Sequence, residues 1–148
     1  MIFRSKASGH SMDFFLVEGD EIVYSDSKDY YFGDIIVYKC PKSQKLVCHR
    51  FFFHLGAYYI VAGDNNTHFE IISKSDLMGK GIMLIRTNKK RYNLEKIDDC
   101  RTRYVKFIFK CVLIGSLGQK IPGLKRMYNK NIVVRNKLQV KYIEKCSL

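Results

Sequence analysis

Tryptophan is absent from this 148-residue chain and proline occurs only twice, whereas tyrosine and phenylalanine occur ten times each. This composition suits strands, whose half-buried surfaces favour aromatic and β-branched side chains. The five cysteines form no C-x-x-C pair and have no zinc-ligand spacing: Cys40, Cys48, Cys100, Cys111 and Cys146. We therefore expect no disulfide framework, no structural metal site and no cofactor.

Long apolar runs are missing as well. No uninterrupted run reaches the roughly 18 residues of a transmembrane helix, and the opening residues MIFRSKASGH lack the apolar core of a secretory signal peptide. We therefore expect a cytoplasmic protein, or one that is peripheral at a membrane, without an N-terminal anchor. The chain is 47% hydrophobic, which is enough to bury one sizeable core.

Charge is divided unevenly along the chain. Residues 1–100 carry 14 Lys and Arg against 13 Asp and Glu, whereas residues 101–148 carry 12 against a single acid, Glu144. This asymmetry predicts a boundary near Cys100, between a domain over residues 1–100 and a basic C-terminal extension over residues 101–148. Such an extension favours an anionic partner, and a solvated basic face is the plainer alternative.

The segment RYVKFIFKCVLIGSLG, residues 103–118, has apolar residues at helical spacing and places Arg103, Lys106 and Lys110 on another side. This pattern is typical of a basic amphipathic helix in a membrane interface. An ordinary packing helix or a strand fits about as well. An anionic membrane surface that contacts residues 101–148 is the expected partner, and nucleic acid is less favoured.

Apolar runs rich in β-branched and aromatic residues fill much of the first hundred positions. They cover residues 21–26, 34–40, 45–55, 57–64 and 81–87, and each is bounded by Gly, Asp, Asn, Ser or Pro. Because no long helical segments separate these runs, they predict an antiparallel, mainly β domain rather than a doubly wound sheet.

Several short motifs follow one another in the order of the boxes of a known family. They are GHSM at residues 9–12 followed by Gly19-Asp20, GDIIVY at 33–38, CHR at 48–50, GDNN at 63–66 and GKG at 79–81. Over residues 8–85 the chain thereby resembles type I signal peptidases and their S24/S26 serine peptidase relatives. The resemblance implies a β-rich signal-peptidase/LexA-like domain, followed here by a basic and partly helical extension.

The resemblance assigns Ser11 as the nucleophile. A serine hydroxyl needs an adjacent base to remove its proton, and His49 stands in the strand where bacterial relatives have a lysine. The chain is therefore similar to the Ser-His kind of signal peptidase, found in the endoplasmic reticulum and in archaea. A neutral imidazole is available at physiological pH because its ordinary pKa is about 6.5. The structural alternatives are a turn serine and a buried histidine.

A third residue should orient the imidazole, and the stretch GDNNTHFE contains two candidates. Asp64 belongs to the GDNN motif itself. Glu70 lies six residues later, where Ser-His relatives commonly have a second aspartate. Both stay open, because Asp64 can instead organise the turn through its side chain.

The oxyanion hole would use the backbone N–H of Ser11, with Gly9 permitting close approach. Some bacterial relatives add a serine hydroxyl at the position of Gly9, so that helper is missing here or is replaced by Ser8 or His10. Met12 is expected to pack beneath the site.

The resemblance implies a serine endopeptidase that removes a leader or signal-like peptide from a peptide or protein precursor, and that cuts after small residues because the pockets of this family accept small side chains. The alternative is a catalytically inactive member of the fold whose basic extension binds membrane or nucleic acid. His54 and His68 lack metal-ligand spacing with His49, so we expect them to have surface or packing roles.

Overall fold

The computed structural model describes all residues except 14, 96–98, 119–133, 136 and 143–148. Its strands are β1 (Ile2–Lys6), β2 (Glu21–Ser25), β3 (Ile35–Lys39), β4 (Leu46–Leu55), β5 (Tyr58–Ala62), β6 (Glu70–Ser73), β7 (Leu77–Ile85) and β8 (Arg91–Asn93). A short 3-10 turn, η1 (Lys74–Asp76), precedes β7, and α1 (Asp99–Gly118) follows the strands. Residues 134–135 and 137–142 are also helical and are called the tail helix below.

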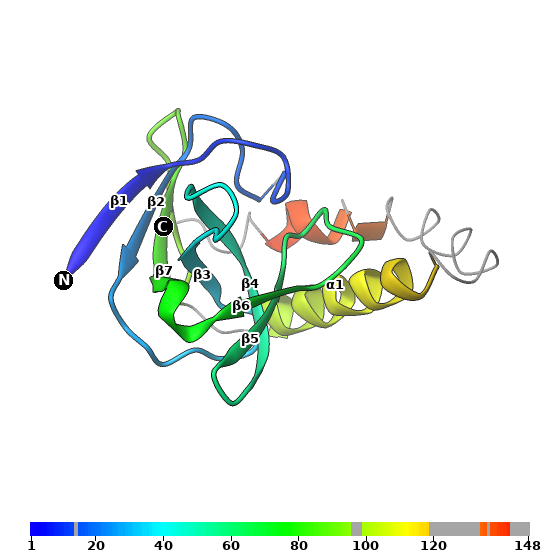
Figure 1. The fold of residues 1–148 in the computed structure, drawn as a ribbon. Coiled ribbons are helices and arrows are strands. Elements are labelled where there is room, and N and C mark those ends of the chain that lie inside the picture. Colours follow the sequence, from blue (N-terminus) through cyan, green and yellow to red (C-terminus); the bar gives the residue numbers. More distant parts are fainter. Residues whose placement is uncertain (14, 96–98, 119–133, 136, 143–148) are drawn as a thin grey trace.

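All eight strands belong to one antiparallel sheet in the order β1-β2-β7-β3-β4-β5-β6, with β8 paired to β7 (Figure 1). The mainly β, antiparallel class expected from the sequence is confirmed. The five apolar runs correspond to β2, β3, β4, β5 and β7. The sequence did not indicate β1, β6 or β8. The edge strand β1 (IFRSK) has four exposed side chains and no alternation of apolar and polar residues, and β6 and β8 are only four and three residues long.

The two faces of the sheet bury different cores, because side chains alternate along each strand. In β3, Ile35 and Val37 enter the larger core, whereas Ile36 and Tyr38 enter a smaller core on the opposite face. The larger core also contains residues of α1 and of the tail helix: Tyr104, Val105, Ile108, Val112 and Tyr142. One side of α1 and one side of the tail helix therefore pack into the same hydrophobic core as the strands.

The apolar side of α1 is occupied by the protein itself. Val105, Ile108 and Val112 are each at most 1% exposed, and Phe109 contacts Phe52 and Phe69. The expectation that this side lies in a membrane interface is therefore corrected to the packing alternative. No helix among the described residues is long and apolar enough to span a bilayer.

Each of three Gly-Asp pairs ends in a buried carboxylate that binds an arginine from another element. The ion pairs are Asp20 with Arg86, Asp34 with Arg101, and Asp64 with Arg50. Gly19 and Gly33 have φ values of +87° and +88°, which L side chains rarely adopt. The pair formed by Asp34 joins the start of β3 to the start of α1.

Gly33 also lets α1 approach the sheet, because a Cβ atom at Gly33 would lie 2.6 Å from Val105. Gly56 is a matched control, because its φ is also positive but a Cβ atom added there would have no other atom within 4 Å apart from its immediate chain neighbours. Both Gly→Ala changes share a backbone cost of roughly 1–2 kcal/mol. We expect Gly33→Ala to lose about 1–3 kcal/mol more than Gly56→Ala in urea unfolding, because it overpacks the contact with Val105. Equal losses would show that this contact does not hold α1 on the sheet.

Candidate active site

The structure brings Ser11 and His49 into hydrogen-bond contact. Ser11 lies in the turn that follows β1, and its Oγ is 2.9 Å from Nε2 of His49 on β4. His49 is 3% exposed, so its ring is held by its surroundings. A third segment touches both residues, because a Cβ at Gly63 would lie 2.4 Å from the Ser11 carbonyl oxygen and 3.0 Å from Nε2. Only glycine fits beneath this pair without displacing it.

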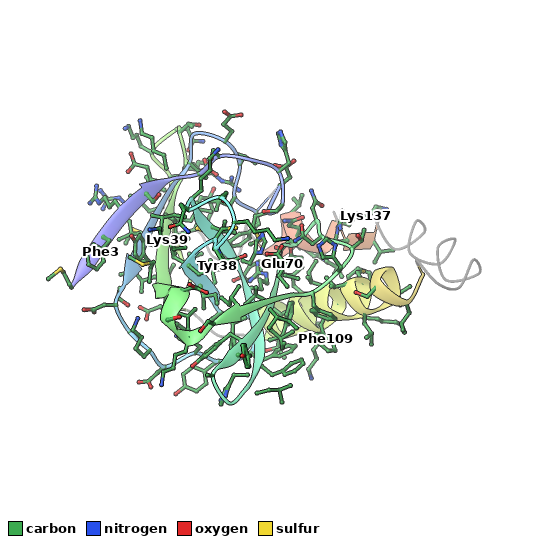
Figure 2. The ribbon with its side chains drawn as sticks, viewed as in Figure 1. Phe3, Tyr38, Lys39, Glu70, Phe109 and Lys137 are labelled. Atoms are coloured by element: carbon green, nitrogen blue, oxygen red, sulfur yellow. The ribbon has the colours of Figure 1, made fainter. Side chains whose placement is uncertain are left out.

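Tyr38 and Glu70, which Figure 2 labels, lie on the Nδ1 side of the His49 imidazole. The Tyr38 hydroxyl is 3.0 Å from Nδ1 of His49 and donates a hydrogen bond to Glu70 at 2.8 Å. Glu70 Oε1 is itself 3.5 Å from Nδ1. Because the Tyr38 hydroxyl donates its proton to the hydrogen bond with Glu70, the Tyr38 oxygen accepts a hydrogen bond from the N–H at Nδ1 of His49. This leaves Nε2 of His49 with a lone pair aimed at the Ser11 hydroxyl.

The surroundings of His49 favour its neutral form. Burial lowers the pKa of His49 below its usual value, and the negative charges of Glu70 and Asp64 oppose this shift only in part. Burial, together with the charge of Glu70, raises the pKa of Tyr38 far above its ordinary range. Tyr38 therefore stays protonated and His49 stays available as a proton acceptor at neutral pH.

Of the two acids left open by the sequence, Glu70 is the one that contacts the imidazole. The carboxylate of Asp64 instead binds Nε and the second guanidinium nitrogen of Arg50 at 2.7 and 3.0 Å. It also accepts a hydrogen bond from Tyr104 at 2.5 Å. Asp64 and Arg50 are each 1% exposed. Asp64 thus belongs to a buried network on the opposite face of β4 from His49.

This network supports the turn that carries Ser11. The Arg50 guanidinium lies 4.6 Å from the ring centre of Phe15, four residues after Ser11. The Asn65 N–H donates to the Ser11 carbonyl at 2.8 Å. The Asp64 N–H contacts the sulfur of Met12, which is 3% exposed beneath the site as expected.

The tail helix contacts both the turn that carries Ser11 and the GDNN turn. Arg135 donates to the carbonyl of Asp64, and Gln139 donates to the carbonyl of Asp13, each at 3.0 Å. Tyr142 stacks on Phe15 with ring centres 5.6 Å apart. Residues far from Ser11 in sequence therefore fix the turns on both sides of it.

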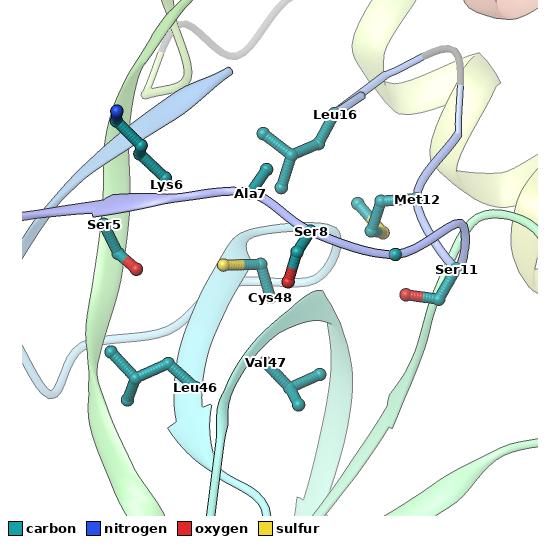
Figure 3. A pocket seen from close by; sticks show the side chains of 11 residues that line it. Ser5, Lys6, Ala7, Ser8, Ser11, Met12, Leu16, Leu46, Val47 and Cys48 are labelled. Carbon is teal, nitrogen blue, oxygen red and sulfur yellow. The ribbon is translucent and has the colours of Figure 1, made fainter. Parts of the chain in front are cut away.

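A cavity of about 100 Å³ opens beside Ser11 (Figure 3). One wall is the chain from Ser5 to Gly9 and another is the start of β4, Leu46 to Cys48. The hydroxyls of Ser8 and Ser11 point into this cavity. Burial raises the pKa of the Cys48 thiol to about 12, so Cys48 is a neutral, unreactive part of the wall.

The two remaining histidine candidates lie elsewhere. His54 stacks on Tyr59 at 5.5 Å between ring centres, and His68 lines a separate cavity beside Glu70. Within the described part of the chain, no three His, Cys, Asp or Glu side chains are grouped so that they could hold a metal ion.

Sequence reasoning missed Tyr38. The signal that could have revealed it is strand register: Ile36 pairs with His49 across β3 and β4, which places Tyr38 diagonally beside His49 on the same face. That register depends on where the β3–β4 turn closes, and the sequence PKSQ does not specify this closely.

Comparison with protein-family models, curated proteins and solved structures finds no match to this chain. The chemistry of the site therefore has to be inferred from its geometry.

The buried network makes Asp64 a stability determinant. Asp64→Asn removes the charge that compensates Arg50, and breaking a buried ion pair in this way costs about 3–5 kcal/mol. We expect that loss in the free energy of unfolding measured with urea. The control is Asp29→Asn, an exposed aspartate, which should change the value by no more than about 0.5 kcal/mol. Similar values for the two variants would contradict a structural role for Asp64.

Proposed function

We propose that the chain is a serine endopeptidase of the signal-peptidase-like S24/S26 kind, with Ser11 as nucleophile and His49 as general base. The observation that carries the proposal is the contact of 2.9 Å between Ser11 Oγ and His49 Nε2, with Tyr38 and Glu70 ordered behind the ring. This is the arrangement by which a base activates a hydroxyl and a third group orients the base.

The reaction follows from the proton positions. His49 Nε2 takes the Ser11 proton while Oγ attacks the peptide carbonyl, and the imidazolium then donates that proton to the leaving amine. The C–N bond breaks and an acyl-enzyme ester remains on Ser11. A water molecule then gives one proton to His49 and attacks the ester carbonyl. The C–O bond to Ser11 breaks as His49 returns that proton to Oγ, which releases the new carboxyl end and restores the Ser11 hydroxyl.

Glu70 and Tyr38 act on His49 rather than on the substrate. A negative charge near Nδ1 stabilises the imidazolium that forms during attack. The Tyr38 hydroxyl relays part of this effect, because it accepts from Nδ1 while it donates to Glu70. Tyr38 and Glu70 are therefore positioning residues, whereas Asp64 supports the site through its ion pair with Arg50.

The cavity beside Ser11 supports a peptide substrate with a small side chain before the cut bond. Its volume of about 100 Å³ accommodates a residue such as alanine or serine. Both walls include strand residues with an available edge: Ser5 and Lys6 end β1, which is paired with β2 alone, and Leu46–Cys48 pair with β3 alone among the described strands. An extended peptide can add its backbone hydrogen bonds between these edges.

The direct test is peptide hydrolysis. A library of extended peptides with a varied residue before each bond is incubated with the protein, and products are identified by mass spectrometry. We expect cuts after small residues, and losses of at least about 10⁴-fold in kcat/KM for Ser11→Ala and for His49→Ala. The double variant should be scarcely worse than either single one, because the two residues act as a unit.

Equal cleavage by the wild type and Ser11→Ala would assign the activity to a contaminant and reject the proposal. Hydrolysis that is lost in Ser11→Ala but kept in His49→Ala would reject His49 as the base.

The pH profile tests the groups behind His49. Activity needs the neutral ring, and burial lowers the pKa of His49, so kcat should fall with acid only below the usual histidine value of about 6.5. Glu70→Gln removes a charge that raises this pKa, so the acid limb should move still lower while kcat drops about 10²-fold or more.

Tyr38→Phe deletes one hydrogen bond to a charged group, which is worth about 1.5–3 kcal/mol, so kcat should fall at least tenfold.

Tyr58→Phe is the matched control, because Tyr58 is 60% exposed at the end of β5 away from Ser11. Its kcat and pH profile should equal those of the wild type. An acid limb that Glu70→Gln leaves unmoved would show that Glu70 does not act on His49.

A further inference from the structure

The exposed side of α1 is a single stripe whose character changes along the helix. Its exposed residues follow one another at spacings of three and four, so they share one side: Arg103, Lys106, Lys110, Leu113 and Leu117. The first three are basic and the last two are aliphatic, with Leu113 42% and Leu117 47% exposed. The buried face described above lies on the other sides of the helix.

The tail helix has the same division. Arg135, Gln139 and Tyr142 are buried against the turns around Ser11. Val134, Lys137, Val140 and Lys141 are exposed, and Val134 and Val140 are 46% and 52% accessible. These four exposed residues line a groove together with the half-buried Leu138. Figure 2 labels Lys137 on this helix.

The two helices lie beside each other at one side of the sheet (Figure 1), and Tyr104 of α1 stacks on Tyr142 at 5.1 Å. Their exposed residues are called the outer face below. Among residues whose exposure the structure describes, the outer face combines lysine and arginine with four accessible aliphatic side chains and contains no acid. Asp99 begins α1 four residues before Arg103, and Glu144 is the one acid that follows it in the sequence.

We infer that the outer face of α1 and the tail helix binds the surface of an anionic lipid bilayer. Charge complementarity provides the attraction, since residues 101–148 carry nearly all of the net charge of +12. The aliphatic residues favour lipid over nucleic acid. Leu113, Leu117 and Val140 cannot form hydrogen bonds with phosphates or base edges, but they can enter the boundary between the headgroups and the acyl chains. Lysine stems then lie along the apolar layer with their amines at the headgroups.

This surface differs from the membrane helix suggested by the sequence. The apolar side of residues 103–118 packs inside the protein, so contact with lipid depends on the opposite stripe. The inference does not depend on peptidase activity, and lipid binding is measurable whether or not Ser11 reacts.

The test is vesicle sedimentation of the full chain. Vesicles of phosphatidylcholine with about 30% phosphatidylserine, in about 0.1 M NaCl, should bind the protein at least tenfold more tightly than pure phosphatidylcholine. Reversing two charges on the outer face with Lys106→Glu and Lys110→Glu should weaken this binding by about tenfold or more. Replacing the leucines with Leu113→Ser and Leu117→Ser should weaken it by several-fold at unchanged charge.

The matched control is Lys89→Glu with Lys90→Glu, which makes the same charge change on exposed lysines in the turn between β7 and β8. Circular dichroism confirms that each variant is folded. The control pair should bind within about threefold of the wild type. Equal losses for the two charge-reversed pairs, full binding by the leucine variant, or tighter binding to a DNA duplex than to vesicles in the same salt would each overturn the inference.

Discussion

The buried ion pair between Asp64 and Arg50 holds the site together. Arg50 follows His49 directly and points to the opposite face of β4, so fixing its guanidinium also fixes the strand position of the imidazole. The same guanidinium lies over Phe15, which belongs to the turn of Ser11. Asp64 directly follows Gly63, which is in close contact with both Ser11 and His49. One charge pair therefore sets the relative positions of the nucleophile, the base and the loop beneath them.

The helices after the strands complete this support. Tyr104 of α1 and Arg135 of the tail helix both bind Asp64, through its carboxylate and its carbonyl. Burial would lower the pKa of Arg50, but Asp64 and the two tyrosines Tyr104 and Tyr142 reverse the shift, so Arg50 stays charged in the core. A group of aromatic rings and hydrogen bonds thus compensates the cost of burying a charge. Residues 101–117 of α1 and the tail helix are therefore part of the site's scaffold on one face and solvent-exposed on the other.

Apolar runs sufficed to predict the mainly β class and the five central strands. The order of the motifs, and not the apolar runs, predicted that Ser11 and His49 lie together. Three features lay beyond such reasoning for identifiable causes. β1 is an exposed edge strand without an apolar pattern. The roles of Asp64 and Glu70 depend on which face of the sheet each side chain reaches, and the sequence places the two only six residues apart, in and just after the GDNN turn. The packing of α1 against Gly33 depends on a contact between distant segments.

The Gly-Asp pairs show why motif order alone is incomplete. Each pair forms a turn whose aspartate binds an arginine from another element, which is a structural role. Such pairs can therefore occur in proteins with or without catalysis. The catalytic claim rests instead on the Nε2 lone pair of His49, which the Tyr38–Glu70 hydrogen bond directs at Ser11.

Trapping the acyl-enzyme tests that claim most directly. A peptide ester with alanine at its reactive carbonyl is mixed with the protein and quenched in acid, and intact-mass and tandem mass spectrometry locate the adduct. The account predicts one added acyl group on Ser11, absent from Ser11→Ala and strongly reduced in His49→Ala. An adduct on another residue, or no adduct with an ester that the wild type hydrolyses, would contradict it.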